Sequence, residues 1–153
     1  MSNYKTVFFT LGVLLIVLGF SMLVPITIQL IYNEFNSTFI ISSIITITFG
    51  ALFFLANIDH NRSLSTQQAF LLTALSWIGV AIFGSIPFIF SDLNLSLTDA
   101  IFESMSGITT TGATIINNLS DTPKAILGWR AMLQWLGGIG ILSLIHISEP
   151  TRL

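Results

Sequence analysis

The chain has 153 residues, of which 53% are hydrophobic and only 8% are charged, and its mean hydropathy is +0.88. Soluble domains carry about 25% charged residues, whereas here the runs 6–33, 35–58 and 63–91 have none. Each run exceeds the roughly 20 apolar residues that a membrane helix needs, so composition excludes a soluble domain and predicts an integral membrane protein. The net charge of −2 excludes a basic nucleic-acid-binding surface, and the lack of cysteine excludes a disulfide framework and a cysteine nucleophile.

The first predicted membrane helix covers residues 7–31. Gly12, Gly19 and Ser21 interrupt its bulky apolar surface, which either allows a neighbouring helix to approach closely or is simply tolerated against lipid. Pro25 is expected to kink the outer third of this helix, because proline removes a backbone hydrogen bond.

A second membrane helix is predicted over residues 38–57 and a third over residues 67–90. The second is rich in Ile, Thr and Phe, which also suit a strand, but its length favours a helix. Positive residues near helix ends mark the cytoplasmic side. Lys5 and Arg62 therefore predict a cytoplasmic N-terminus and a cytoplasmic link at 59–66, and they place residues 91–121 outside the cytoplasm.

The next predicted helix, residues 97–108, is too short to cross a membrane. Ser96 and Asp99 have the spacing of a capping box at its start, and its 12 residues would span about 18 Å. Residues 109–114 (TTTGAT) are β-branched apart from one glycine and one alanine, which disfavours helix. A returning helix is predicted from Pro123 into the 140s. This order predicts a re-entrant pore loop; the alternative is an exposed threonine-rich loop beside an amphipathic surface helix.

The extended segment suits cation binding, since its free carbonyl oxygens could replace the hydration shell of an ion. Gly112 would permit the positive φ that turns such carbonyls toward one axis. Asp99 and Glu103 lie four residues apart, and we interpret them as capping and hydrogen-bonding groups, not as a catalytic pair. Arg130 lies in an apolar helix and needs either a partner, Glu103 or Asp99, or a path for its side chain to the surface. No enzyme, metal-cluster or cofactor motif accompanies these residues.

Three segments resemble the TrkH family of bacterial potassium uptake subunits, within the Trk/Ktr/HKT superfamily of cation transporters: 99–114 (DAIFESMSGITTTGAT), 123–130 (PKAILGWR) and 134–140 (QWLGGIG). The resemblance extends over nearly the whole chain up to Ile141. It implies an all-α membrane protein in which four helix–pore loop–helix repeats surround one pore and two further helices precede the first repeat. Residues 1–58 would then be the leading helix pair, 59–66 a cytoplasmic linker and 67–141 the first repeat.

The same resemblance implies a function and a site. The family's K+ filter matches Thr110, Thr111 and Gly112, with Ala113 adjacent, and Asp99, Glu103 and Arg130 would support it. K+ would be the transported ion, with no cofactor and no other metal. The family further implies the bacterial inner membrane, a cytoplasmic nucleotide-binding regulatory subunit and homodimerisation of the full-length protein.

Two features depart from the family pattern. The chain contains one filter segment where the pore needs four, and residues 142–153 resemble a translated sequencing-library adapter. We therefore expect a non-native tail and an N-terminal fragment of a potassium transporter. Two other hypotheses remain open: a small subunit that forms a homotetrameric cation channel, and a non-conducting membrane scaffold whose threonine-rich loop binds a partner.

Overall fold

The computed structural model describes residues 4–58 and 66–148, and for residues 141–148 it describes the backbone alone. Its described residues form helices and no strand, which confirms the all-α prediction: α1 (Lys5–Ser21), α2 (Leu23–Tyr32), α3 (Thr38–Ala56), α4 (Thr66–Ile89), α5 (Leu97–Ile108) and α6 (Lys124–Ser148). Within this part of the chain, α1 with α2, α3 and α4 are long and apolar enough to cross a membrane. The expected returning helix is α6, which continues unbroken past residue 141.

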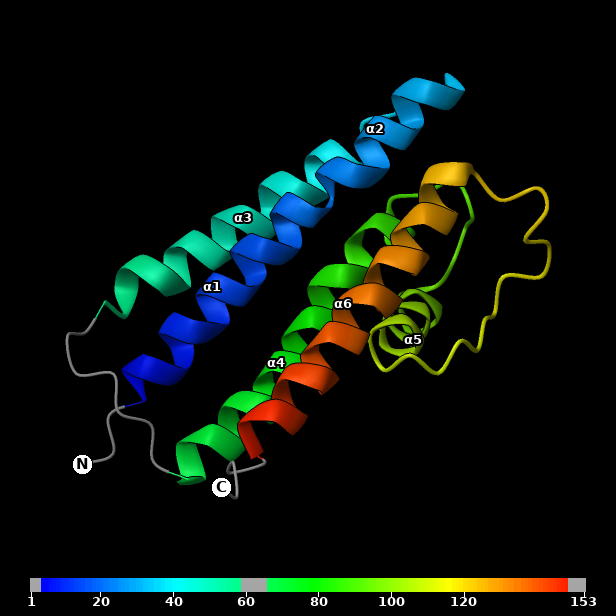
Figure 1. Cartoon of the computed structure of the whole chain (residues 1–153). Coiled ribbons are helices and arrows are strands. Elements are labelled where there is room, and N and C mark those ends of the chain that lie inside the picture. The colour runs from blue at the N-terminus through cyan, green and yellow to red at the C-terminus, as the bar shows by residue number, and fades with distance from the viewer. Residues whose placement is uncertain (1–3, 59–65, 149–153) are drawn as a thin grey trace.

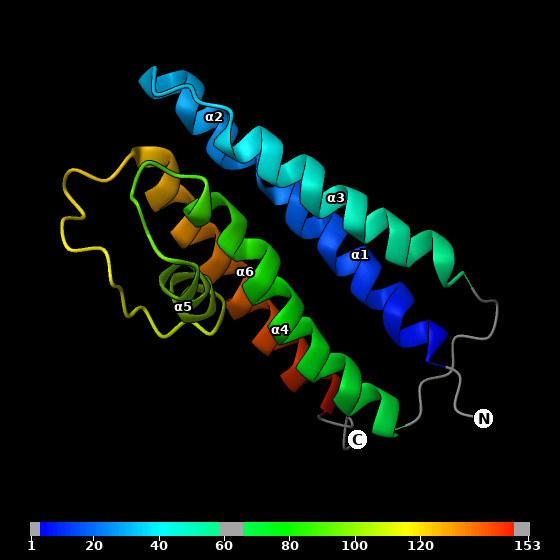
Figure 2. The same cartoon turned by 180° about the vertical axis from the view of Figure 1, so that it is seen from behind.

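The long helices form two antiparallel pairs (Figure 1). One pair consists of α3 and the α1–α2 stretch, and the other consists of α4 and α6. The short helix α5 lies across the second pair and is seen end-on in both views, while the 109–123 segment loops outside the bundle to the start of α6 (Figure 2). The start of α1, the end of α3 and the start of α4 share one end of the bundle. The order of the crossings matches the predicted one, whereas Arg62, on which the predicted cytoplasmic side depends, lies outside the described residues.

The first membrane helix is broken at Met22, between α1 and α2. The break comes one turn before Pro25, which has no N–H to offer to the carbonyl of Ser21. At this point the Met22 N–H bonds instead to the Gly19 carbonyl, three residues earlier, at 3.3 Å. The helix is therefore interrupted near Pro25 as expected, one turn closer to the N-terminus than the proline itself.

Glycines bring α1 and α3 into backbone contact. A Cβ added to Gly12 would lie 2.6 Å from the backbone nitrogen of Phe54 and 2.8 Å from the carbonyl oxygen of Gly50. At the next turns, the Ser43 hydroxyl donates to the Gly19 carbonyl at 2.8 Å. Small residues and interhelical hydroxyl bonds of this kind hold helices together in membranes, where lipid gives no hydrophobic drive for association. The close-packing interpretation of these glycines therefore holds over the lipid-facing one.

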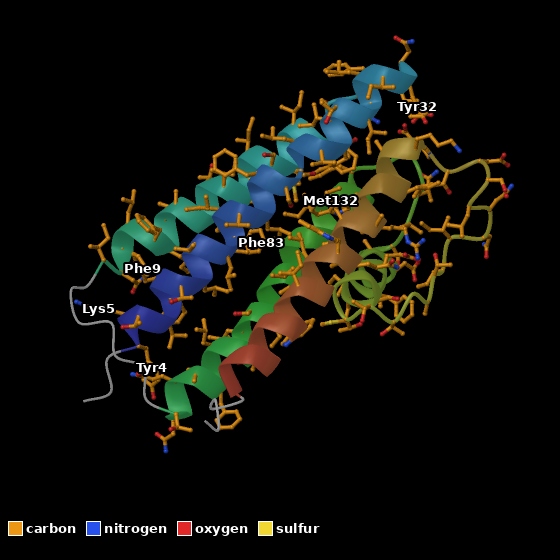
Figure 3. All side chains as sticks on the ribbon, in the orientation of Figure 1. Tyr4, Lys5, Phe9, Tyr32, Phe83 and Met132 are labelled. Carbon is orange, nitrogen blue, oxygen red and sulfur yellow. The ribbon has the colours of Figure 1, made fainter. Side chains whose placement is uncertain are left out.

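The two helix pairs meet through aromatic side chains. Trp129 of α6 is fully buried and donates its indole N–H to the carbonyl of Gly84 in α4 at 2.9 Å. The same ring meets Phe39 of α3 edge to face, with centroids 6.2 Å apart. Phe83 and Met132 also project into the layer between the pairs (Figure 3). This layer fixes the leading helices against α4 and α6, which carry the short helix.

The start of α6 is capped from a distant part of the chain. Glu34, in the link between α2 and α3, accepts a hydrogen bond from the backbone N–H of Lys124 at 2.9 Å. A carboxylate at this position satisfies a free helical donor and faces the positive end of the helix dipole. We expected this helix to begin at Pro123, but Pro123 precedes the first helical residue, Lys124. The nearby carboxylate of Asp121 bonds to the side chain of Asn118.

Candidate functional site: the loop between α5 and α6

The helix α5 has the predicted bounds and the predicted cap. The Ser96 hydroxyl accepts from the Asp99 N–H at 3.2 Å, and the Asp99 carboxylate accepts from the Ser96 N–H at 3.4 Å. Asp99 is thereby engaged at the N-terminal end of the helix, whereas the threonine-rich loop leaves from the C-terminal end. Asp99 stabilises the helix that carries the loop and does not contact the loop itself.

The C-terminal end of α5 has the hydrogen bonds of a Schellman motif. The Thr110 N–H donates to the Gly107 carbonyl at 2.9 Å, and the Thr111 N–H donates to the Ser106 carbonyl at 3.0 Å. Thr110 occupies the left-handed position of the motif, with φ of 57°. Glycine usually fills this position, because a β-branched side chain there is strained. Such strain is concentrated at functional sites.

Beyond this motif the chain is extended and exposed, and Gly112 has the positive φ that the sequence predicts, at 78°. Within the described part of the chain, the carbonyl oxygens of Thr110, Thr111 and Gly112 accept no hydrogen bond. The Ala113 carbonyl differs, since it accepts from the Ser106 hydroxyl at 2.6 Å. The carbonyls of Thr110, Thr111 and Gly112 are therefore unbonded, and they lie next to the partially negative end of α5.

Glu103 anchors the far side of this loop. Its side chain is fully buried. One carboxylate oxygen accepts from the Thr114 hydroxyl at 2.5 Å and from the Ile115 N–H at 2.6 Å. The other oxygen accepts from Arg130 Nε at 2.9 Å. A buried carboxylate is costly unless it is paired and hydrogen-bonded, and this one is satisfied by α6 and by the loop together.

Arg130 therefore pairs with Glu103 and not with Asp99, the other partner considered. Its side chain is 13% exposed, so it does not extend along the helix surface to reach water. The ion pair joins α6 to α5 directly behind the extended segment. The structure thus brings Glu103 and Arg130 together with Thr114, and leaves Asp99 apart.

Gly137 allows α6 to pass the end of α5. A Cβ on Gly137 would overlap the carbonyl oxygen of Ile108, the last residue of α5, whereas one on Gly138 or Gly140 would meet nothing within 4 Å. Because α6 runs through residues 137–140 without interruption, Gly137 serves close packing and does not mark a break in the helix.

A separate crevice of about 460 Å³ lies between α1, α4 and α6, and its lining is almost wholly apolar. Its hydroxyl-bearing residues Thr10, Thr73 and Ser76 bond to carbonyls of their own helices. The described residues also contain no cluster of acidic and histidine side chains able to hold a metal. Neither feature competes with the 109–115 segment as a cation site.

The sequence analysis missed Ser106, which bonds to three successive residues of the loop. It named Thr110 as a filter residue but expected it only to be extended, not left-handed. The one available signal was a small polar residue on the buried face of the short helix, one turn before the threonines. That signal is weak, because serine is also common as a plain packing residue in membrane helices.

Comparisons with known proteins place the chain among cation transporters. Residues 35–152 match the family described as TrkH, cation transport protein. The chain is 43% identical over 143 residues to the Trk system potassium uptake protein TrkH of Halomonas elongata, covering 92% of this chain and 30% of that protein. It is 37% identical over 148 residues to the protein of the same name from Escherichia coli K12, again covering 30% of it.

A solved structure resembles the whole described fold. The crystal structure of the potassium transporter TrkH from Vibrio parahaemolyticus superposes with a TM-score of 0.87 at 37% identity, covering 94% of this chain and 31% of that one. The chain thus spans about 30% of the length of the curated relatives that it matches. These relatives are ion transporters rather than enzymes, and with the apolar helices they identify a multi-pass membrane protein.

Proposed function

The chain belongs to the TrkH family of cation transport proteins, and from this premise we propose that it contributes one wall of a K+ pathway through the membrane. In this proposal residues 67–141 are one helix–pore loop–helix repeat, and the leading helices 1–58 support it. Backbone carbonyls of Thr110, Thr111 and Gly112 take the place of water around the ion, while the adjacent Ala113 carbonyl is engaged by the Ser106 hydroxyl. The membrane potential drives transport, at about 2.3 kcal/mol per charge per 100 mV.

The observation that carries the proposal is the contrast between free and bound carbonyls. Thr110, Thr111 and Gly112 leave their carbonyls without a protein donor, while both flanks of the segment are tied down, by Ser106 on one side and by Glu103 on the other. Non-helical backbone at membrane depth is tolerated only where it is buried in protein or lines water. A row of unbonded carbonyls on a fixed support is what a selectivity filter requires.

The supporting residues have different tasks in this account. Glu103 and Arg130 hold the returning limb of the loop against α5 and α6. Asp99 stabilises the start of the short helix. The C-terminal end of that helix directs its partial negative charge toward the loop, with no basic side chain in its last turn to neutralise it.

One loop can contact an ion from one side only, so the coordination shell must be completed by further loops. The relatives are about three times as long as this chain, which supports a pore built from several such repeats. With the family we further propose a bacterial inner-membrane location with a cytoplasmic N-terminus, homodimerisation of the full-length protein, and a nucleotide-binding regulatory subunit on the cytoplasmic side.

A chimaera tests the proposal. Residues 1–140 replace the matched segment of the Vibrio parahaemolyticus TrkH, and the chimaera is expressed in a bacterium that lacks its own K+ uptake systems. We expect growth at low K+ with the chimaera and none with residues 1–153 alone. Growth with the chain alone would instead favour a homotetrameric channel. A chimaera that reaches the membrane but restores neither growth nor uptake would overturn the proposed function.

A further inference from the structure

Ser106 makes hydrogen bonds to three successive residues of the loop. It lies in the last turn of α5 and is 5% exposed. Its carbonyl accepts from the Thr111 N–H at 3.0 Å and from the Gly112 N–H at 3.4 Å. Its hydroxyl donates to the carbonyl of Ala113 at 2.6 Å. The backbone of this short stretch is therefore held from within its own helix.

A substitution at Ser106 can remove the bond from its side-chain hydroxyl but not the bonds to its backbone carbonyl. The bonds to the Ser106 carbonyl belong to the backbone and survive any side-chain change that preserves the helix end. The hydroxyl bond is the one contribution of the side chain, and it determines whether the Ala113 carbonyl has a hydrogen-bond donor. With the hydroxyl present, this carbonyl is oriented by a donor, whereas the three carbonyls before it are not.

We propose that the Ser106 hydroxyl is a positioning group that determines which monovalent cation the loop accepts, an inference that rests on the function proposed above. By orienting the Ala113 carbonyl, it limits the coordinating set to the carbonyls of Thr110, Thr111 and Gly112. Without the hydroxyl, the Ala113 carbonyl is free to rotate toward an ion, and the segment loses a fastening point. The first consequence changes the number of carbonyl ligands, and the second changes how closely the segment keeps its fit around the ion. Both quantities are invoked to explain how a filter discriminates between K+ and the smaller Na+.

The chain supplies a matched control in the same helix. Ser104 is fully buried, and its hydroxyl has no hydrogen-bond partner among the described residues. Ser104→Ala and Ser106→Ala therefore delete the same atom from positions two residues apart in one helix. Only the second deletion removes a bond to the loop.

The experiment measures initial uptake of Rb+, as a K+ analogue, and of Na+ in cells that carry the chimaera described above. The readout is the Rb+/Na+ uptake ratio, which does not depend on how much protein reaches the membrane. Ser106→Ala is expected to lower the ratio roughly three- to tenfold, the size of effect that follows from losing one hydrogen bond. Ser104→Ala should leave the ratio within about twofold of the parent, and Ser106→Thr, which keeps a hydroxyl, should restore most of it.

The outcomes separate this proposal from the one on which it rests. If the parent chimaera transports no Rb+, the proposed function fails. If it transports Rb+ and Ser106→Ala keeps the parent ratio, or if Ser104→Ala lowers the ratio equally, the role of Ser106 is overturned while transport stands. If Ser106→Ala shows no uptake, Ser106→Cys, which retains a weak donor, must show an intermediate ratio; a parent-like ratio in that variant would also refute the role.

Discussion

The buried carboxylate of Glu103 lies 2.9 Å from Nε of Arg130, and its second oxygen accepts from the backbone N–H of Ile115 at 2.6 Å. One side chain of α5 thereby joins α6 to the returning limb of the loop. Because the extended segment has no secondary structure of its own, its shape depends on such attachments.

Arg130→Gln is expected to destabilise the chain by about 3 kcal/mol, because it leaves the Glu103 charge buried without a counter-charge. Lys124→Gln is the control, since Lys124 is an exposed cation at the start of the same helix. Combining Glu103→Gln with Arg130→Gln should cost less than the sum of the single changes, as residues in direct contact do not act additively. Thermal unfolding in detergent measures all four variants, and equal effects of Arg130→Gln and Lys124→Gln would contradict the pairing.

Gly137→Ala is expected to destabilise by about 2 kcal/mol, since its methyl group would overlap the Ile108 carbonyl at the end of α5. Gly138→Ala adds the same group where nothing lies within 4 Å, and it should be neutral or stabilising by up to about 1 kcal/mol through helix propensity. Both are compared by thermal unfolding of the same preparation. A Gly138→Ala variant that unfolds as early as Gly137→Ala would show that the close approach is not the cause.

Thr110→Gly is expected to relieve the strain of a β-branched residue at φ of 57° and to stabilise the fold by roughly 1 kcal/mol. Thr111→Gly removes a side chain from a position without positive φ and should destabilise instead, because glycine adds disorder to the unfolded chain. If the strain serves ion recognition, Thr110→Gly will also weaken Rb+/Na+ discrimination in the chimaera while raising its melting temperature. A melting temperature that falls in Thr110→Gly would refute the strain.

Glu34→Ala is expected to destabilise by about 1 kcal/mol, the usual cost of losing a helix N-terminal cap. The matched control is Asp92→Ala, because Asp92 is exposed and only its backbone carbonyl, not its carboxylate, accepts a hydrogen bond within the described residues. Hydrogen exchange at the first turn of α6 gives a local readout, and protection there should fall in Glu34→Ala alone. Unchanged protection in that turn would show that the cap contributes nothing.

The elements that the sequence predicts well are those determined by neighbouring residues. The bounds of α5 follow from a capping box at one end and a threonine run at the other, and the positive φ of Gly112 follows from the residue type. The break before Pro25 is also local, although it lies at Met22, because the proline acts on a carbonyl four residues earlier.

The relationships that escape prediction connect distant residues. Glu34 caps a helix that begins 90 residues later, and nothing near either position indicates this. The choice of Glu103 over Asp99 as the partner of Arg130 depends on how α5 lies across α6, which no periodicity specifies. The strain at Thr110 escapes prediction for a different reason. A Schellman motif is normally recognised in a sequence by a glycine at its left-handed position, and here that position is a threonine.

A structure of the chimaera determined in Tl+, a heavy analogue of K+ that is located by its anomalous scattering, tests whether the carbonyls of Thr110, Thr111 and Gly112 bind the transported ion. We expect anomalous density within coordinating distance of these three carbonyl oxygens, and we expect it to disappear when Na+ replaces Tl+. Density confined to other parts of a chimaera that transports Rb+ would contradict it.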